Sequence, residues 1–281
     1  MKNSLIIASF ISALALSSTA NAVVITSENN GATLANTILG SGITISNVSY
    51  TGANGASGIF TDGNSSGIAI DKGIILSTGQ ATNAIGPNDN TGTGTTNGTS
   101  GYAPLTAISG FSTYDASVLK FDFEFAGGEG GDLFFNFVFG SEEYLEWVNS
   151  QYNDVFGFFV DGVNVALTPG SGDPITINTI NNTQNSGLFI NNESAIYNTQ
   201  MDGFTKSLQI SLKSLSAGLH TMEFAIADAG DSSLDSWIFI EANSFSNVPD
   251  PVGVPEPSTL TLLGLMLAAL GWKHRKTKAA K

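Results

Sequence analysis

Hydrophobic and polar residues alternate one by one in the middle of the chain. Over residues 118–125, Leu119, Phe121 and Phe123 alternate with charged residues. A period of two places alternate side chains on opposite faces of a strand, so the pattern predicts one face in the core and one in water. Residues 133–139 and 155–160 are apolar at almost every position, which predicts central strands buried on both faces.

Three later segments continue the strand pattern. Apolar residues alternate with polar ones over residues 208–212, and residues 219–227 and 236–242 are predicted to form two further strands. Helical patterns are confined to residues 32–39 and 142–148. Strands joined by Gly- and Asn-rich turns predict an all-β fold, an antiparallel β-sandwich of the jelly-roll type with one or two short helices.

A long polar segment interrupts these strands. Residues 77–103 are rich in Gly, Thr and Asn and contain few apolar residues. A long segment without secondary structure in a compact domain is either functional or disordered. We predict a mobile surface loop here.

Composition and charge narrow the possible partners. Only 12% of the chain is charged, and residues 23–253 hold four lysines against 23 acidic residues, a net charge near −19. This charge repels phosphate backbones, which excludes nucleic acid as a partner. It attracts cations, and calcium is the cation that clustered carboxylates bind outside cells. The chain has no cysteine, which excludes disulfides, thiolate zinc sites and cysteine nucleophiles.

The N-terminal segment, residues 1–22, has the order of a secretory signal peptide. Lys2 gives the positive start, residues 5–16 are apolar, and Ala20 and Ala22 are the small residues of a cleavage site. We therefore expect export through the Sec machinery.

The C-terminal segment, residues 254–281, has three parts in a fixed order. It opens with a short motif, Val254, Pro255, Glu256, Pro257 and Ser258. An apolar run over residues 260–272 follows, and a basic cluster containing Lys273, Arg275 and Lys276 comes next. This order resembles the PEP-CTERM sorting signal, in which an integral-membrane transpeptidase, exosortase, is understood to cut near Pro-Glu-Pro and release or re-anchor the protein.

The resemblance implies exosortase as a partner, a transient stay in the inner membrane, and a final location at the cell surface or in the extracellular matrix. The uncharged stretch 257–272 spans about 24 Å as a helix, against a hydrocarbon core of ~30 Å. We expect a short transmembrane sorting helix, with a permanent tail anchor as the alternative. Residues 247–253 form a Pro-rich linker that holds the body away from the membrane.

The body resembles a known surface domain. The resemblance rests on residues 73–79, 86–88, 140–144, 153–159 and 225–236, which read GIILSTG, GPN, GSEEY, NDVFGFF and AIADAGDSSLDS. These segments are similar to the choice-of-anchor L domain, whose members are surface proteins with different anchoring tails. We assign residues 23–246 to this domain. The resemblance implies location and architecture, and it leaves the molecular activity open.

Six acidic residues in these segments are candidate calcium ligands. They are Glu142, Glu143, Asp154, Asp228, Asp231 and Asp235. Many carboxylates without a cationic neighbour fit a calcium site, which would rigidify loops rather than catalyse a reaction. The alternative is a solvated acidic rim in which Asp and Ser side chains cap turns. No linear calcium motif such as an EF-hand loop is present.

Three ring-bearing residues, His220, Trp147 and Trp237, are possible ligand contacts. His220 shares a strand face with apolar residues and is predicted to be a core or rim residue, and Trp237 lies in an apolar run and is predicted to be a core residue. Trp147, in the segment 142–148, is the candidate ligand contact because an indole ring stacks on the apolar face of a sugar.

These observations favour an exported, non-enzymatic adhesion or biofilm-matrix component associated with exopolysaccharide. One alternative is an exported glycosidase-like enzyme that uses a carboxylate pair roughly 5–10 Å apart, drawn from Glu142, Glu143 or Asp154. Another is a calcium-dependent lectin-like module. A cleft lined by aromatic residues around a carboxylate pair would favour the enzyme.

Overall fold

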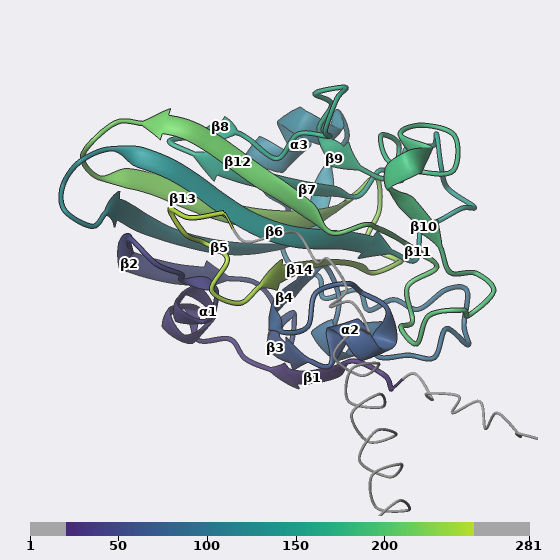
Figure 1. Ribbon diagram of the computed structural model, residues 1–281. Helices are drawn as coiled ribbons and strands as arrows, with labels where there is room; N and C mark the ends of the chain where they lie inside the picture. Colours follow the sequence, from purple (N-terminus) through teal and green to yellow (C-terminus); the bar gives the residue numbers. More distant parts are fainter. Residues whose placement is uncertain (1–20, 250–281) are drawn as a thin grey trace, which may run out of the picture.

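Two antiparallel sheets face one another in the computed structural model, which describes residues 21–249 (Figure 1). The larger sheet has the order β1-β3-β4-β14-β6-β11-β10, and β12 also pairs with β6. Its strands are β1 (Val24–Ser27), β3 (Ser57–Thr61), β4 (Gly73–Ser77), β6 (Gly131–Ser141), β10 (Phe189–Asn191), β11 (Gly203–Thr205), β12 (Leu208–Leu215) and β14 (Ser236–Glu241).

The smaller sheet has the order β2-β5-β13-β7-β8, and β9 also pairs with β7. Its strands are β2 (Ile43–Thr51), β5 (Thr113–Phe125), β7 (Val155–Val160), β8 (Val163–Asn164), β9 (Ile175–Thr176) and β13 (His220–Ala229). Helical elements are short. They are α1 (Gly31–Ile38), α2 (Gly63–Ser66), α3 (Ala103–Ser109) and the 3-10 turns η1 (Ala81–Ala84) and η2 (Ser186–Leu188).

The main core lies between the two sheets and is rich in phenylalanine. The ring of Phe135 on β6 lies 4.1 Å from that of Phe158 on β7, centroid to centroid, and 5.3 Å from that of Phe224 on β13. Phe121 and Phe123 of β5 belong to the same cluster and are fully buried. The alternation in residues 118–125 therefore marks the core face of a strand, as predicted.

Central strands bury their second face as well. Val138 of β6 packs with Trp237 and Phe239 in a cluster outside the larger sheet. Phe159 of β7 packs with Leu105 of α3, which covers the outer face of the smaller sheet (Figure 1). The prediction of strands buried on both sides at residues 133–139 and 155–160 is confirmed.

One helix prediction is confirmed and one is wrong. Residues 31–38 form α1, whose first turn is capped by the Asn30 side chain, which accepts from the Thr33 N–H. Residues 142–148 form turns instead of a helix. A helix would place Glu142 and Glu146 on one face, but the structure buries Glu142 completely and exposes Glu146.

The all-β class with two antiparallel sheets is confirmed, while the jelly-roll connectivity stays a prediction. Among residues 21–249, no helix has the length and apolarity needed to cross a bilayer. The signal peptide up to Ala20, the sorting motif at residues 254–258, the expected transmembrane sorting helix and the basic cluster at residues 273–276 lie outside the described residues.

A buried carboxylate cluster as the candidate functional site

Strand pairing brings the six predicted acidic residues to one end of the sandwich. Glu142 and Glu143 follow the last residue of β6, Ser141, which pairs with Ser236 at the start of β14. Asp154 precedes β7, whose first residue, Val155, pairs with Ala227 near the end of β13. The three remaining residues, Asp228, Asp231 and Asp235, lie at the end of β13 and in the turn that leads to β14.

Asp154 links the two sheets at this end. Its Oδ1 accepts a hydrogen bond from the Ala229 N–H at 2.9 Å, on the smaller sheet. Its Oδ2 accepts from the Ser236 hydroxyl at 2.6 Å, on the larger sheet. Asp154 is 1% exposed, so this buried carboxylate connects the two sheets through its hydrogen bonds.

The polar segment between β4 and β5 lies over the cluster. Alternate main-chain N–H groups of the extended stretch 93–99 all point at buried carboxylates. Thr93 donates to Glu142 Oε2 at 3.0 Å and Thr95 to Asp235 Oδ1 at 2.7 Å. Asn97 and Thr99 donate to the two carboxylate oxygens of Asp115, at 2.9 and 2.5 Å. The predicted mobile surface loop is corrected here, because residues 93–99 are fixed to the acidic cluster.

Asp235 accepts three hydrogen bonds, all from the polar segment. Besides Thr95, its donors are the Gln80 N–H and the Asn83 side-chain amide, at 3.2 and 3.0 Å from Oδ2. Burial raises its pKa to about 6, against the lowering effect of these hydrogen bonds. Asp235, which lies next to the start of β14, therefore holds two separate parts of the polar segment, residues 80–83 and Thr95.

Glu142, Glu143 and Asp228 are held with a stronger bias toward the protonated form. Burial raises the pKa of Glu142 to about 9, against the hydrogen bond from Thr93. Burial, and then the negative charges of Asp154 and Asp231, raise the pKa of Glu143. Burial and the charge of Asp154 raise the pKa of Asp228 well above its usual value. Several negative groups thus share one poorly solvated region.

Four carboxylates have an oxygen without a hydrogen-bond partner among the described residues. These atoms are Glu142 Oε1, Glu143 Oε2, Asp202 Oδ2 and Asp228 Oδ1. All four side chains are at most 2% exposed. Ion pairs within residues 21–249 engage other acidic residues, namely Glu223 with Lys120, Asp132 with Lys213, and Asp161 with His220. A buried, unpartnered carboxylate oxygen is costly, and a proton or a metal ion would relieve that cost.

The donor set fits a hard cation in part. Oxygen ligands predominate, as calcium requires. Over residues 21–249, however, no three acidic or histidine side chains converge as a ready-made metal group. A calcium ion would therefore combine one or two carboxylates with main-chain, amide or water oxygens, which calcium accepts among its six to eight ligands.

A cavity of about 480 Å³ opens beside the cluster. Glu143, Asp231 and Glu146 line it together with Trp147 and Tyr152. Trp147 is 42% exposed, and its ring lies 4.9 Å from that of Tyr152 in an edge-on arrangement. The predicted ligand-contact residue and two of the predicted calcium ligands therefore face the same cavity. By contrast, Trp237 is buried, as predicted for a core residue, and so is His220, predicted to be a core or rim residue.

Sequence reasoning missed two members of the cluster. Asp115 occupies an odd-numbered position of β5, as do the core residues Leu119 and Phe121. An acidic residue at such a position could have indicated a buried carboxylate. Asp202, whose pKa burial raises to about 6, precedes β11 in an irregular segment. It accepts from the Asn88 side chain at 2.7 Å, a contact across 114 residues that no local pattern encodes.

The fold and the site define a two-sheet all-β protein with a buried acidic cluster at one end of its sandwich. Residues 22–246 match the choice-of-anchor L domain, so the chain belongs to the choice-of-anchor L domain family. Residues 253–276 match the PEP-CTERM protein-sorting motif. Both resemblances inferred from the sequence are confirmed, and together they indicate an exported surface protein that exosortase sorts.

Other comparisons add little. The curated proteins include no match to this chain. A solved β-glucosidase from Kluyveromyces marxianus is similar over 46% of this chain at 9% identity, with a TM-score of 0.19. The aligned part spans 11% of that enzyme's length. A likeness of this size carries no argument about fold or activity.

Proposed function

We propose that the exported protein is a non-enzymatic adhesion or matrix component that associates with exopolysaccharide. The carrying observation is that the buried carboxylates at the end of the sandwich bind the protein's own main chain. Asp154 joins the two sheets, and Asp235 and Asp115 hold the segment 93–99. Carboxylates used in this way shape a surface and are withdrawn from chemistry on a substrate. The matched families are also anchoring and sorting types.

Calcium is part of this proposal as a structural ion. The unpartnered oxygens of Glu142, Glu143, Asp202 and Asp228 support it, since a divalent cation offsets the repulsion among buried carboxylates. Calcium would hold the cluster in its ionised form and so fix the overlying polar segment. A matrix protein of this kind would be rigid where calcium is plentiful.

Deletion of the gene in the producing cells tests the proposed role. The expected result is loss of cell aggregation or of matrix retention, with no change in the rate at which the producer's polysaccharide is hydrolysed. Purified protein should also be retained by the native exopolysaccharide in a pull-down. Unchanged aggregation and retention after deletion would contradict the proposal.

The cavity beside the cluster supports a second candidate, a glycosidase-like enzyme. Trp147 and Tyr152 line it around Glu143 and Asp231, and the raised pKa of Glu143 suits a general acid. Incubation of the purified protein with the producer's polysaccharide distinguishes the two functions. Release of reducing ends by the native protein, and its loss in Glu143→Gln, would establish the enzyme and overturn the matrix proposal.

A further inference from the structure

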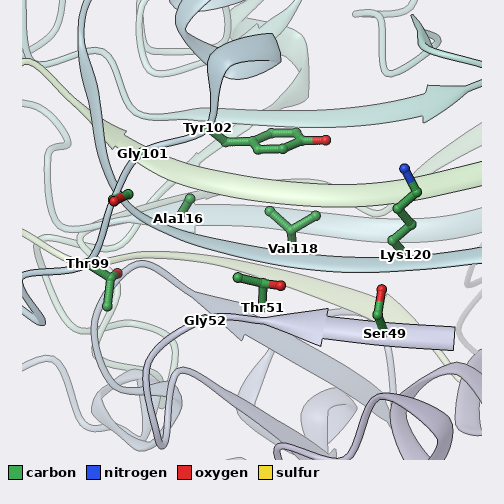
Figure 2. Close-up of a pocket in the computed structure, with 10 residues that line it drawn as sticks. Ser49, Thr51, Gly52, Thr99, Gly101, Tyr102, Ala116, Val118 and Lys120 are labelled. Atoms are coloured by element: carbon green, nitrogen blue, oxygen red, sulfur yellow. The ribbon is translucent and has the colours of Figure 1, made fainter.

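A second groove, of about 440 Å³, lies on the outer face of the smaller sheet (Figure 2). It forms where β2 separates from β5. Thr51, the last residue of β2, pairs with Val118 of β5. Nearer the start of β5, Ser100 is the neighbour of β5 in place of β2. Ser100 forms a β-bridge with Tyr114, and its carbonyl oxygen accepts from the Ala116 N–H at 3.1 Å. The notch between Thr51 and Ser100 is therefore built into the sheet.

The base of the groove is apolar and carries an aromatic ring. Ala116 and Val118 form its floor and are 7% and 9% exposed. The ring of Tyr102 lies along the side of the groove opposite Thr51, with Ala116 and Val118 between them (Figure 2). The Tyr102 hydroxyl donates to Glu223, and the ring packs edge-on against Phe159 with centroids 6.4 Å apart. Contacts at both ends hold the ring in place, so the platform is formed before any ligand binds.

Polar groups surround this apolar base. The hydroxyl-bearing residues Ser49 and Thr51 come from β2, and Thr99 lies at the end of the groove away from Lys120 (Figure 2). Lys120 lies at one end, where its ammonium is 2.6 Å from Glu223 Oε1. An ammonium has three N–H donors, so this group and the hydroxyls supply both donors and acceptors around the Tyr102 ring.

We infer that this groove binds a neutral saccharide. A sugar ring combines an apolar C–H face with a rim of hydroxyls, and the groove offers the matching arrangement of Tyr102, Val118 and hydroxyl groups. Its volume lies within the range of small-ligand pockets, roughly 300–1,000 Å³. Glu223 neutralises Lys120, and the body carries a net charge near −19 (four lysines against 23 acidic residues in residues 23–253). Uronic acids and phosphates are therefore disfavoured.

This inference rests on the proposed matrix role and names the place where the polysaccharide is held. The groove is separate from the cavity that contains Trp147, since the two share no lining residue. A substitution in one of these two sites is therefore expected to leave ligand binding at the other site unchanged.

Calorimetric titration of the purified full chain tests the inference. The probes are neutral disaccharides of hexose and N-acetylhexosamine units, with the matching uronic-acid disaccharides as a second arm. Thr51 is exposed and tryptophan is favoured in strands, so Thr51→Trp should fill the groove and keep the fold. Tyr102→Ala removes the platform, and Phe111→Ala, at an exposed aromatic residue that lines neither cavity, is the matched control.

The expected result is that at least one neutral disaccharide binds the native protein. Thr51→Trp and Tyr102→Ala should weaken that binding by about tenfold or more, as truncation of an anchoring aromatic does, and Phe111→Ala should leave it unchanged. If Tyr102→Ala fails to fold, Thr51→Trp decides alone. The inference is overturned if no neutral disaccharide binds, if the uronic-acid arm binds more tightly, or if Thr51→Trp retains native affinity.

Cells separate this inference from the proposed function. If gene deletion abolishes matrix retention and Thr51→Trp lowers it too, both stand. If deletion abolishes retention but Thr51→Trp retains it fully, the groove inference fails and the matrix role stands. If deletion has no effect on retention, the matrix role itself fails, and the titration alone then decides on the groove.

Discussion

Buried carboxylates at one end of the sandwich are subject to two opposing forces. Main-chain N–H groups stabilise the ionised form, and the loss of water destabilises it. Asp235 accepts from two such groups and from the Asn83 side-chain amide and has the smaller pKa rise, whereas Glu143 has an unpartnered oxygen and acidic neighbours. At neutral pH without metal, Glu143 is therefore held mainly in its protonated form, and this proton uptake costs stability that calcium binding would replace.

Glu143→Gln should separate these effects. In EDTA at pH 8, the neutral amide should raise the free energy of unfolding by about 1–3 kcal/mol, because the folded protein no longer has to protonate a carboxyl that is ionised in the unfolded chain. The same variant should reduce the stabilisation by calcium. Glu146→Gln is the control, since Glu146 lines the same cavity but is exposed and should change neither quantity. Loss of stability in EDTA together with a full calcium response would contradict this view of Glu143.

The pH dependence of the metal-free protein follows from the same groups. The folded-state pKa of Glu142 is raised from 4.5 to about 9 and that of Asp235 from 3.8 to about 6. The folded protein thus binds protons more tightly than the unfolded chain, so this stability is complete below about pH 4 and is lost as pH rises to about 9. Exposed Asp132 has a lowered pKa of opposite sign, but solvent screens it.

The melting temperature in EDTA should therefore fall steadily from pH 5 to pH 9. A higher melting temperature at pH 9 than at pH 5 would mean that these carboxyls are already compensated in the metal-free protein. Thermal melts followed by circular dichroism are sufficient for this comparison.

At the scale of elements, the polar segment between β4 and β5 acts as a cover over the cluster. Its glycines allow close approach to neighbouring main chain. A Cβ added at Gly94 would lie 1.7 Å from the Ser233 carbonyl oxygen, whereas one added at Gly92 would meet nothing closer than 3.9 Å. Gly94 lies between Thr93 and Thr95, whose N–H groups bind the carboxylates.

Gly94→Ala should therefore lift the segment away from the cluster. The expected cost is about 1–3 kcal/mol of unfolding free energy, the range for overpacking in a tight site, with faster proteolytic cleavage within residues 91–99. Gly92→Ala is the matched control in the same segment and should behave like the native protein. Equal behaviour of the two alanine variants would show that residues 93–99 are not held as described.

Sequence patterns predicted the elements better than their tertiary contacts. Periodicity of two located β5, β12 and β13, since side-chain alternation is a local property. The helix predicted for residues 142–148 failed because a tertiary force, the burial of Glu142 beneath Thr93, outweighs local helix propensity. The same contact fixes the segment that composition alone presented as a free loop.

Most residues of the candidate site could be predicted from the sequence, but their positions relative to one another could not. Clustered Asp and Glu at strand ends pointed to Glu142, Asp154 and Asp228. Whether these residues lie near Asp115 and Asp202 depends on which strands become neighbours in the sheets. That choice is made by non-local pairing, such as the register of Ser141 with Ser236.

At the scale of the whole molecule, an acidic β-sandwich is joined to a sorting signal matched at residues 253–276. Deletion of residues 254–281 should leave the body folded, because the described core lies within residues 23–245. The truncated protein should appear in the medium with no exosortase-dependent change in mass, as judged by immunoblotting and mass spectrometry. Surface retention identical to that of the full chain would contradict the assigned sorting role.

Calcium links the three scales, because an ion at the cluster would stabilise single carboxylates, the overlying segment and the whole sandwich together. The most direct test is the melting temperature of the purified full chain at pH 8, in EDTA and with calcium at about 100 times its dissociation constant. Such binding should add about 2.7 kcal/mol, which raises the melting temperature by about 5–10 °C for a domain of this size, with a smaller effect from magnesium. Identical melting temperatures in EDTA and in excess calcium would contradict the account.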